Sequence, residues 1–202
     1  MSREVQYTQD EILSYAPITK LYVEQGMTLF DICEAAVRFS DNTAANLMLN
    51  KLGGPVGFKA ALRGIGDEVS NPVRLEPELN EILLGDDSDT STPRQMALNL
   101  QKYIFGSLLN DEQKQILTDW MTDNEITNSL IKSGVPNGWK VLDKSGSGNY
   151  GTRNDIAIIY PPNSNPIIVA IMTNHNNKND KYDDKLIAEI TKIIIDTFQQ
   201  DM

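Results

Sequence analysis

The hydrophobic residues change their spacing near Gly138, and this change constrains the fold more than any other feature of the chain. Before it, from about Thr8 to Lys132, apolar residues recur mostly at the three- and four-residue spacing of amphipathic helices. After it, β-branched and aromatic runs are separated by turns rich in Gly and Pro, at 139–144, 155–160 and 167–173. A final helical stripe at 182–198 is long enough to cover one side of a sheet. Helices followed by consecutive strands predict an α+β fold.

This pattern predicts two parts, an all-α domain over residues 1–134 and a part over 135–202 that consists of three antiparallel strands and the C-terminal helix. Between Asn71 and Ser91 the helical period disappears and prolines stand at 72 and 77, which indicates a long irregular loop. Such loops inside a compact domain are usually functional. Arg74 and Asp89 lie 15 residues apart at its two ends and could clamp its neck over about 74–89.

Charge and hydropathy exclude several classes of partner. The chain carries 18 Lys and Arg against 28 Asp and Glu, a formal net charge of -10, which repels phosphate backbones and anionic lipid surfaces. We therefore expect neither nucleic acid nor membrane as a partner. The best apolar run, 166–172, is too short to span a bilayer. Residues 1–7 contain neither a basic start nor an apolar stretch, so no export signal is expected in this chain.

Three short motifs could carry chemistry, and each alone has a plain structural explanation. Ser40-Asp41-Asn42 stands at a helix junction, where helix capping is the common role of such residues. Lys144-Ser145-Gly146 ends a predicted strand and enters a Gly-rich turn, as in an ordinary hairpin. The stretch from Glu76 to Asn80 lies in the long loop, where solvated charged residues are usual.

Together and in this order, the motifs resemble those of class A serine β-lactamases, whose signature includes SDN and KTG. The resemblance extends from about Tyr7 to Phe198 and is greatest to the penicillinases of Gram-positive bacilli. It is carried by the stretches 15–17, 40–46, 76–80, 89–93, 143–146 and 153–155. The third motif reads Lys-Ser-Gly instead of Lys-Thr-Gly, which keeps the hydroxyl group. The family fold is α+β, an all-α domain plus an antiparallel sheet flanked by helices in a β-lactamase/transpeptidase-like arrangement of two or three layers.

The resemblance implies three catalytic residues for opening a β-lactam amide through an acyl-enzyme. Ser40 would relay a proton to the departing lactam nitrogen, and Lys144 would supply a positive potential beside it. Glu76, together with Asn80, would orient and deprotonate the water that hydrolyses the acyl-enzyme. This reaction confers resistance to penicillins and cephalosporins.

The remaining site residues would bind or support the substrate, again by resemblance. Asn42 would hydrogen-bond the acylamido side chain, and the backbone N–H of Ser147 would be one of the oxyanion-hole donors. Ser145, in the motif with Gly146, and Arg153 would bind the carboxylate of the drug, the arginine through a charge-assisted fork. Arg74 and Asp89 would form the salt bridge that closes the loop carrying Glu76. No cofactor and no metal are implied.

The family's nucleophile lies in an SxxK motif on a helix that precedes all the residues matched here. The single SxxK string of this sequence, Ser129 to Lys132, follows Glu76 and falls in a segment that the family uses structurally. We therefore expect the fold to be incomplete at its N-terminus and the chain to be inactive alone. The resemblance implies that the full-length protein is a monomer, exported to the periplasm or the extracellular space.

Two other functions remain open at this stage. The chain could be a non-catalytic module that binds β-lactams or other carboxylates through Ser145 and Arg153, or it could be one half of a complementing pair. Glu76 and Asn80 favour a hydrolase over a pure binder, because a binder has no use for a deacylating water. The same glutamate argues against a penicillin-binding or peptidase relative.

Overall fold

The computed structural model describes residues 4–122 and 124–200, without the side chain of residue 125, and its contacts divide the chain into two compact units. Unit 1 comprises Met1–Ser91 and unit 2 comprises Thr92–Met202. Helices and one antiparallel sheet of three strands dominate, so the predicted α+β class is confirmed. No helix within the described ranges combines the length and apolar character that a bilayer crossing requires.

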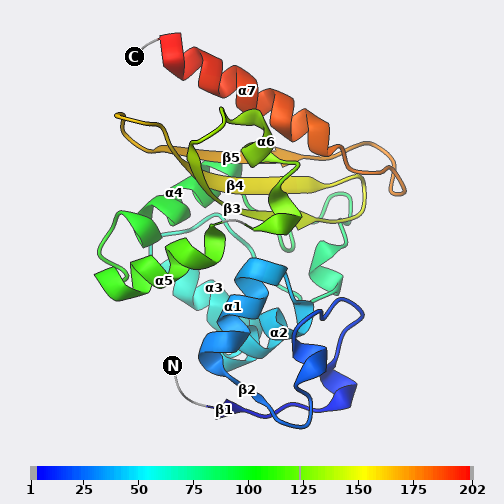
Figure 1. Ribbon diagram of the computed structural model, residues 1–202. Coiled ribbons are helices and arrows are strands. Elements are labelled where there is room, and N and C mark those ends of the chain that lie inside the picture. The colour runs from blue at the N-terminus through cyan, green and yellow to red at the C-terminus, as the bar shows by residue number, and fades with distance from the viewer. Residues whose placement is uncertain (1–3, 123, 201–202) are drawn as a thin grey trace. The chain divides into compact units, whose positions relative to one another are not determined.

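Unit 1 is mostly helical, with a small two-stranded sheet that the sequence did not predict. The antiparallel strands β1 (Glu4–Val5) and β2 (Met27–Thr28) precede α1 (Leu29–Phe39), α2 (Asn42–Lys51) and α3 (Gly54–Gly64), as Figure 1 shows. Short 3₁₀ turns occupy Gln9–Glu11, Thr19–Leu21 and Glu78–Asn80. The apolar stripe of α1 packs with the first strands and α2 into one core, which includes Val5, Tyr7, Met27, Ile32, Ala35, Ala44 and Leu47.

Side-chain caps determine where the helices of unit 1 begin. The Thr28 hydroxyl accepts a hydrogen bond from the Asp31 amide at the start of α1. Thr8 and Glu11, whose spacing in the sequence predicts a capping box, form one at the first 3₁₀ turn. α1 ends at Ser40, which adopts a left-handed conformation with φ of 52°. Because this conformation reverses the chain direction, α2 can begin only two residues later.

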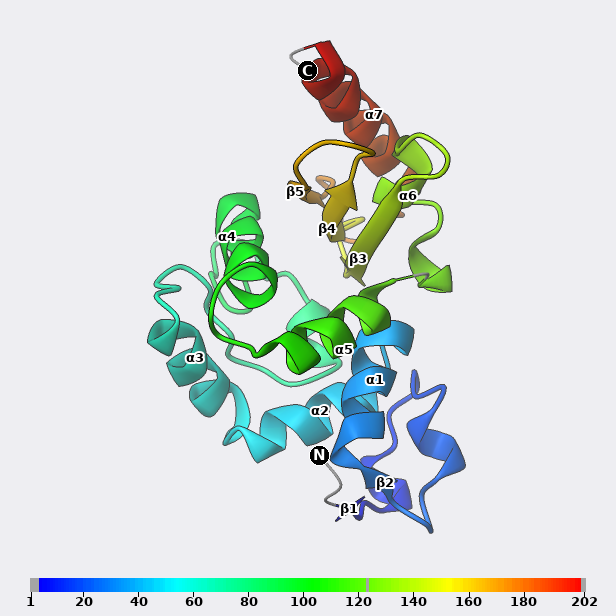
Figure 2. The ribbon, with the colours of Figure 1, turned by 60° about the vertical axis from the view of Figure 1, so that its left-hand side comes forward.

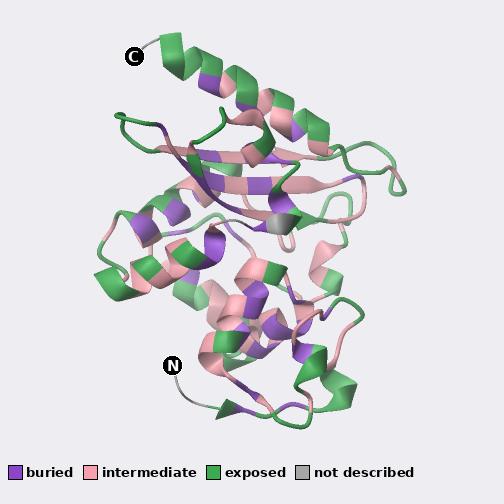
Figure 3. Ribbon diagram, in the orientation of Figure 1, coloured by how far each residue is buried: buried purple, intermediate pink, exposed green. Residues whose placement is uncertain are grey.

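Unit 2 is built on an antiparallel sheet in the order β3-β4-β5, with helices on both faces (Figures 1 and 2). The strands span Lys140–Ser147, Arg153–Tyr160 and Ile167–Thr173, close to the predicted runs. α7 (Asp184–Gln200) covers one face, and α4 (Pro93–Ile104) and α5 (Asp111–Met121) pack against the other. Figure 3 shows that the strands are buried mainly along their middle parts. The core under α7 contains Leu130, Ile131, Val141, Ala157, Ile159, Val169, Ile171, Ile187 and Ile195.

The helical spacing of the apolar residues that precede Gly138 also predicts a helix over 125–132, and this prediction is wrong. The structure has a 3₁₀ turn at Glu125–Thr127 and a short α6 at Ile131–Gly134. The break falls at Leu130, whose ψ of -131° is not helical. The amide of Ile131 donates to the buried Asp155 carboxylate (3.1 Å) instead of continuing a helical ladder. A partner 24 residues away therefore overrides the local helical pattern.

The observed units and the predicted domains differ in where they place residues 92–134. The sequence groups these helices with the N-terminal ones, whereas in the structure α4, α5 and α6 contact the strands of unit 2. The division into domains 1–134 and 135–202 stays a prediction about the organisation of the family fold.

Candidate functional site

The residues expected at the site fall into both units. Unit 1 holds Ser40, Asn42, Arg74, Glu76, Asn80 and Asp89, and unit 2 holds Lys144, Ser145, Gly146, Ser147 and Arg153.

In the Ser40-Asp41-Asn42 motif the middle residue is buried, whereas the two outer residues are partly exposed. Asp41 is fully buried and its carboxylate accepts four hydrogen bonds, from the amides of Ile18, Thr19 and Ala44 and from the Thr19 hydroxyl, at 2.8–3.0 Å. Ser40 and Asn42 are only half-buried. Asp41 thus ties the preceding loop to the start of α2, and its two neighbours in sequence are placed at a fixed bend.

The residues around Asp41 are buried as well. Tyr7 is buried beside it and donates its hydroxyl to the Thr19 carbonyl at 2.7 Å. Burial, and then the negative charge of Asp41, raise the pKa of Tyr7 to about 12. The central residue of the motif is therefore a structural anchor, and any chemistry of this motif falls to Ser40 and Asn42.

Glu76 is held from two sides. Asn46 on α2 makes a reciprocal pair with its backbone: the Asn46 amide donates to the Glu76 carbonyl and the Glu76 N–H donates to the Asn46 side-chain oxygen, both at 2.9 Å. The Asn80 amide donates to the Glu76 carboxylate, across the 3₁₀ turn that follows the cis Glu76–Pro77 bond. The carboxylate is therefore fixed in both position and orientation.

The neck of the loop is closed by Arg74 and Asp89. The Arg74 guanidinium and the Asp89 carboxylate form an ion pair, and the same carboxylate accepts the amides of Val73 (2.7 Å) and Arg74 (3.0 Å). Asp89 is 7% exposed, so solvent screens this pair less than a surface pair. Arg74 also donates to the Glu81 carbonyl (2.8 Å), which holds the loop just beyond Asn80.

In unit 2 the Lys-Ser-Gly motif occupies the last half of β3. Lys144, Ser145, Gly146 and Ser147 stand opposite Ile156, Asp155, Asn154 and Arg153 of β4. The Lys144 ammonium donates to the Ser145 carbonyl at 2.7 Å. Gly146 and Ser147 are exposed, so their backbone lies at the surface of the strand.

Arg153 has partners that sequence reasoning missed. Its Nε donates to Asp184, at the start of α7, at 2.7 Å, and its guanidinium stacks over the Tyr182 ring at 4.7 Å. The Ser129 hydroxyl, from the one SxxK string, also donates to Asp184, at 2.6 Å. A carboxylate ligand of Arg153 would therefore share the arginine with Asp184.

Two buried carboxylates lie under the motif. Asp143 precedes Lys144 and accepts from the Thr127 hydroxyl (2.8 Å), and Asp155 accepts from the Ile131 amide (3.1 Å). Both are at most 1% exposed. Burial, and then repulsion by Asp143, raise the pKa of Asp155 to about 8. Near neutral pH Asp155 therefore holds a proton.

Sequence reasoning assigned no role to Asn46, Asp155 or Asp184. Asn46 fits the helical pattern of α2, and its partner lies 30 residues away. Only the resemblance could have singled it out, because it ends the matched stretch at 40–46. Within the described part of the chain, no group of three or more His, Cys, Asp and Glu residues is arranged to hold a metal ion.

Comparison with known proteins identifies the family. A family model described as "Beta-lactamase enzyme family" matches residues 1–198. Beta-lactamase 3 of Bacillus cereus is 49% identical over 199 residues, which cover 98% of this chain and 63% of that protein. Beta-lactamase ROB-1 of Haemophilus influenzae is 46% identical, with coverages of 98% and 65%. A crystal structure of a class A beta-lactamase from Clostridium kluyveri superimposes with a TM-score of 0.96 at 57% identity, covering 98% of this chain and 76% of that one.

The fold and the sequence thus define the class A type of beta-lactamase fold. The chain belongs to the beta-lactamase enzyme family. It spans slightly less than two-thirds of the length of these two curated relatives, 63% and 65%.

Proposed function

We propose that this chain supplies the deacylating and substrate-binding parts of a serine β-lactamase, which hydrolyses the β-lactam amide through an acyl-enzyme. One observation carries the proposal: Glu76 is fixed from two sides, by Asn46 through its backbone and by Asn80 through its carboxylate. A loop that only connected helices would need neither contact. A carboxylate held in place with a side-chain amide beside it can orient a water molecule for attack.

In the proposed deacylation, Glu76 takes a proton from a water molecule as the water oxygen attacks the acyl carbonyl carbon. The bond to the serine oxygen then breaks, and that oxygen regains a proton. In acylation, Ser40 would pass the proton of the nucleophile to the lactam nitrogen, and the Lys144 ammonium would favour that transfer electrostatically. The Ser147 N–H would stabilise the oxyanion, which its exposed position on β3 allows.

Substrate binding is proposed for Asn42, Ser145 and Arg153, with Gly146 leaving the strand backbone accessible beside them. Because Asp184 already pairs with Arg153, the positive charge offered to a drug carboxylate is partly compensated. Binding at this position would therefore depend as much on the Ser145 hydroxyl as on the arginine.

The serine that forms the acyl-enzyme is not assigned among these 202 residues. Ser40 ends α1 in a left-handed conformation, and the Ser129 hydroxyl donates to Asp184, a carboxylate that already pairs with Arg153. We propose that the nucleophile belongs to the SxxK segment of the family, and that the 202-residue chain alone does not turn over β-lactams. The proposed protein acts on its small substrate as a monomer, is exported, and confers β-lactam resistance.

Mass spectrometry can locate the acyl group. The 202-residue chain is mixed and refolded with the SxxK-containing segment of the Bacillus cereus relative, the Glu76→Gln variant is used to slow deacylation, and benzylpenicillin is added. We expect the mass of the penicillin on the added segment and none on the 202-residue chain. Acylation of this chain at Ser40 or Ser129 would refute the assignment, and no acylation of either chain would favour a module that only binds.

A further inference from the structure

The turn between β3 and β4 packs against the segment that joins β5 to α7. The turn comprises residues 148–152, directly after Ser147, and the covering segment comprises residues 174–183. The Tyr150 N–H donates to the Lys178 carbonyl at 2.9 Å, and the His175 N–H donates to the Tyr150 carbonyl at 2.6 Å. Tyr150 is thus hydrogen-bonded through both of its backbone groups to a segment more than 20 residues away.

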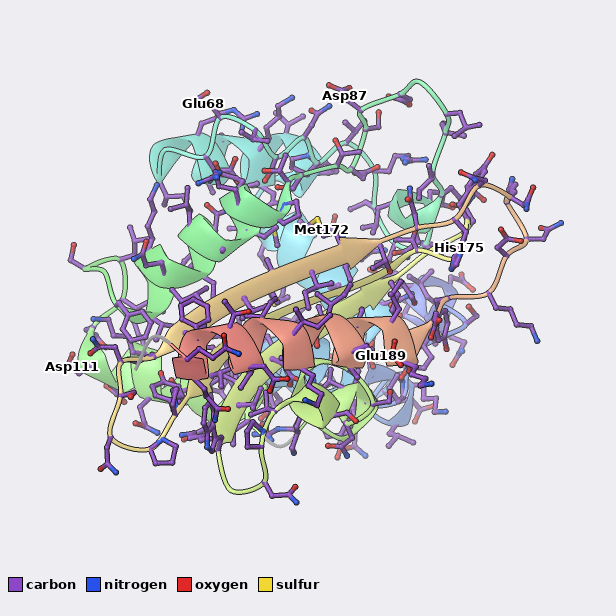
Figure 4. The ribbon with its side chains drawn as sticks, turned by 90° about the horizontal axis from the view of Figure 1, so that it is seen from above. Glu68, Asp87, Asp111, Met172, His175 and Glu189 are labelled. Carbon is purple, nitrogen blue, oxygen red and sulfur yellow. The ribbon has the colours of Figure 1, made fainter. Side chains whose placement is uncertain are left out.

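The side chain of His175 completes this cover. A Cβ at Gly151 would lie 2.3 Å from the His175 ring and 2.9 Å from the Lys181 carbonyl. Gly151 also has φ of 58°, and it is buried although it belongs to a surface turn. Figure 4 shows His175 just beyond the end of β5, on the side of that turn. The ring therefore rests on the backbone of Gly151, where only a glycine leaves room for it.

The same segment is anchored at both of its ends. At one end the Thr173 hydroxyl donates to the Arg153 carbonyl at 2.8 Å. At the other end Tyr182 and Asp184 contact the Arg153 guanidinium. Inside the turn the Gly148 N–H donates to the Thr152 carbonyl at 3.1 Å. A shift of the covering segment would therefore move the turn, and with it the strand end that contains Ser147.

We propose that His175 is a positioning residue, which holds the 148–152 turn in place and so sets the width of the site along Ser147 and Gly148. This inference rests on the proposed function, because it assumes that β-lactams bind along Ser147 and Gly148. The width of the site there would decide whether compact or bulky β-lactams are preferred. Without the ring, the turn gains freedom to move outward, and substrates with large side chains are favoured relative to compact ones.

The first test is hydrogen exchange of the 202-residue chain, which needs no substrate. His175→Ala removes the ring and keeps the backbone N–H, and we expect the Tyr150 amide to exchange about tenfold faster or more. His175→Phe keeps a flat ring of similar size and should restore slow exchange. Lys178→Ala is the matched control, since only the carbonyl of that residue is used. Amides at the centre of β4, such as that of Ile158, should stay protected in every variant.

Unchanged exchange at Tyr150 in His175→Ala, or equally fast exchange in Lys178→Ala, would overturn the proposal. So would a Tyr150 amide that is unprotected in the parent chain. These results do not depend on hydrolysis, so they are distinguishable from a failure of the proposed function.

The second test measures selectivity in the mixture with the SxxK-containing segment. We expect His175→Ala to raise kcat/KM for a cephalosporin with a branched oxyimino side chain by about fivefold relative to benzylpenicillin, mainly through KM. An equal loss for both substrates would mean that His175 is only structural, which contradicts the assigned selectivity. A mixture without hydrolysis would refute the proposed function and the selectivity with it, and would leave the exchange result as evidence on the turn alone.

Discussion

Replacement of the buried Asp155 by asparagine should change how the stability of unit 2 depends on pH. Asp155 has a pKa of about 8 in the folded chain against 3.8 for the same group in water, because it is buried and faces Asp143. Below pH 3.8 both states are protonated and the group has no effect on folding. As the pH rises towards 8, the unfolded chain loses this proton while the folded chain keeps it, so folding becomes less favourable.

The size of the effect follows from the width of that interval. Each unit of pKa difference corresponds to about 1.4 kcal/mol, so the loss of unfolding free energy at pH 8 is on the order of a few kcal/mol. Asparagine is neutral at every pH and can still accept the Ile131 amide. The Asp155→Asn variant should therefore match the parent chain near pH 4 and exceed its unfolding free energy by that amount at pH 8.

Urea unfolding followed by circular dichroism between pH 4 and pH 8 measures this difference. Asp196→Asn serves as the control, because that carboxylate forms an exposed pair with Lys192 on α7 and surface pairs contribute little. A gap between Asp155→Asn and the parent that does not grow with pH would refute the reasoning, as would a variant that becomes less stable than the parent at pH 8.

Three further predictions concern unit 1. Asp41→Ala should lower the unfolding free energy by about 3 kcal/mol or more, because it leaves four donors without their acceptor, and thermal unfolding tests this. Ser40→Gly should instead stabilise the chain by about 1 kcal/mol, since glycine adopts φ of 52° without strain. The same substitution removes the proposed proton relay. Unchanged hydrolysis by the mixture of this variant with the SxxK-containing segment would exclude that role for Ser40. Asn46→Ala should slow deacylation about tenfold or more by releasing the backbone of Glu76, visible as acyl-enzyme that persists in single-turnover mass spectra.

The sequence predicts well those elements whose signals are local. The three strands follow from their β-branched runs, and the starts of α1 and α4 follow from Thr28 and Thr92, each of which caps its helix with its hydroxyl. The loop from Arg74 to Asp89 was also recognisable, because loss of helical period and two charges at its ends are visible without a structure.

The features that the sequence did not reveal depend on partners distant in the chain. The helix expected over 125–132 breaks because the Ile131 amide finds Asp155 on β4, and no local pattern announces that contact. In the sequence Asn46 looks like any other polar residue of a helix, and only the structure shows its hydrogen bonds with the backbone of Glu76. Asp184 reads as the first residue of a helix, where acidic side chains are common, although it also holds Arg153. In each case the polar partner is chosen by tertiary packing.

Hydrolysis of a chromogenic cephalosporin tests most directly the claim that this chain contributes the deacylating half of a β-lactamase. The assay compares the 202-residue chain alone, the chain mixed with the SxxK-containing segment of the Bacillus cereus relative, and the same mixture with Glu76→Gln. The account predicts no turnover by the chain alone, sustained turnover by the mixture, and a single burst with Glu76→Gln. Sustained turnover by the chain alone, or by the Glu76→Gln mixture at the parent rate, would contradict it.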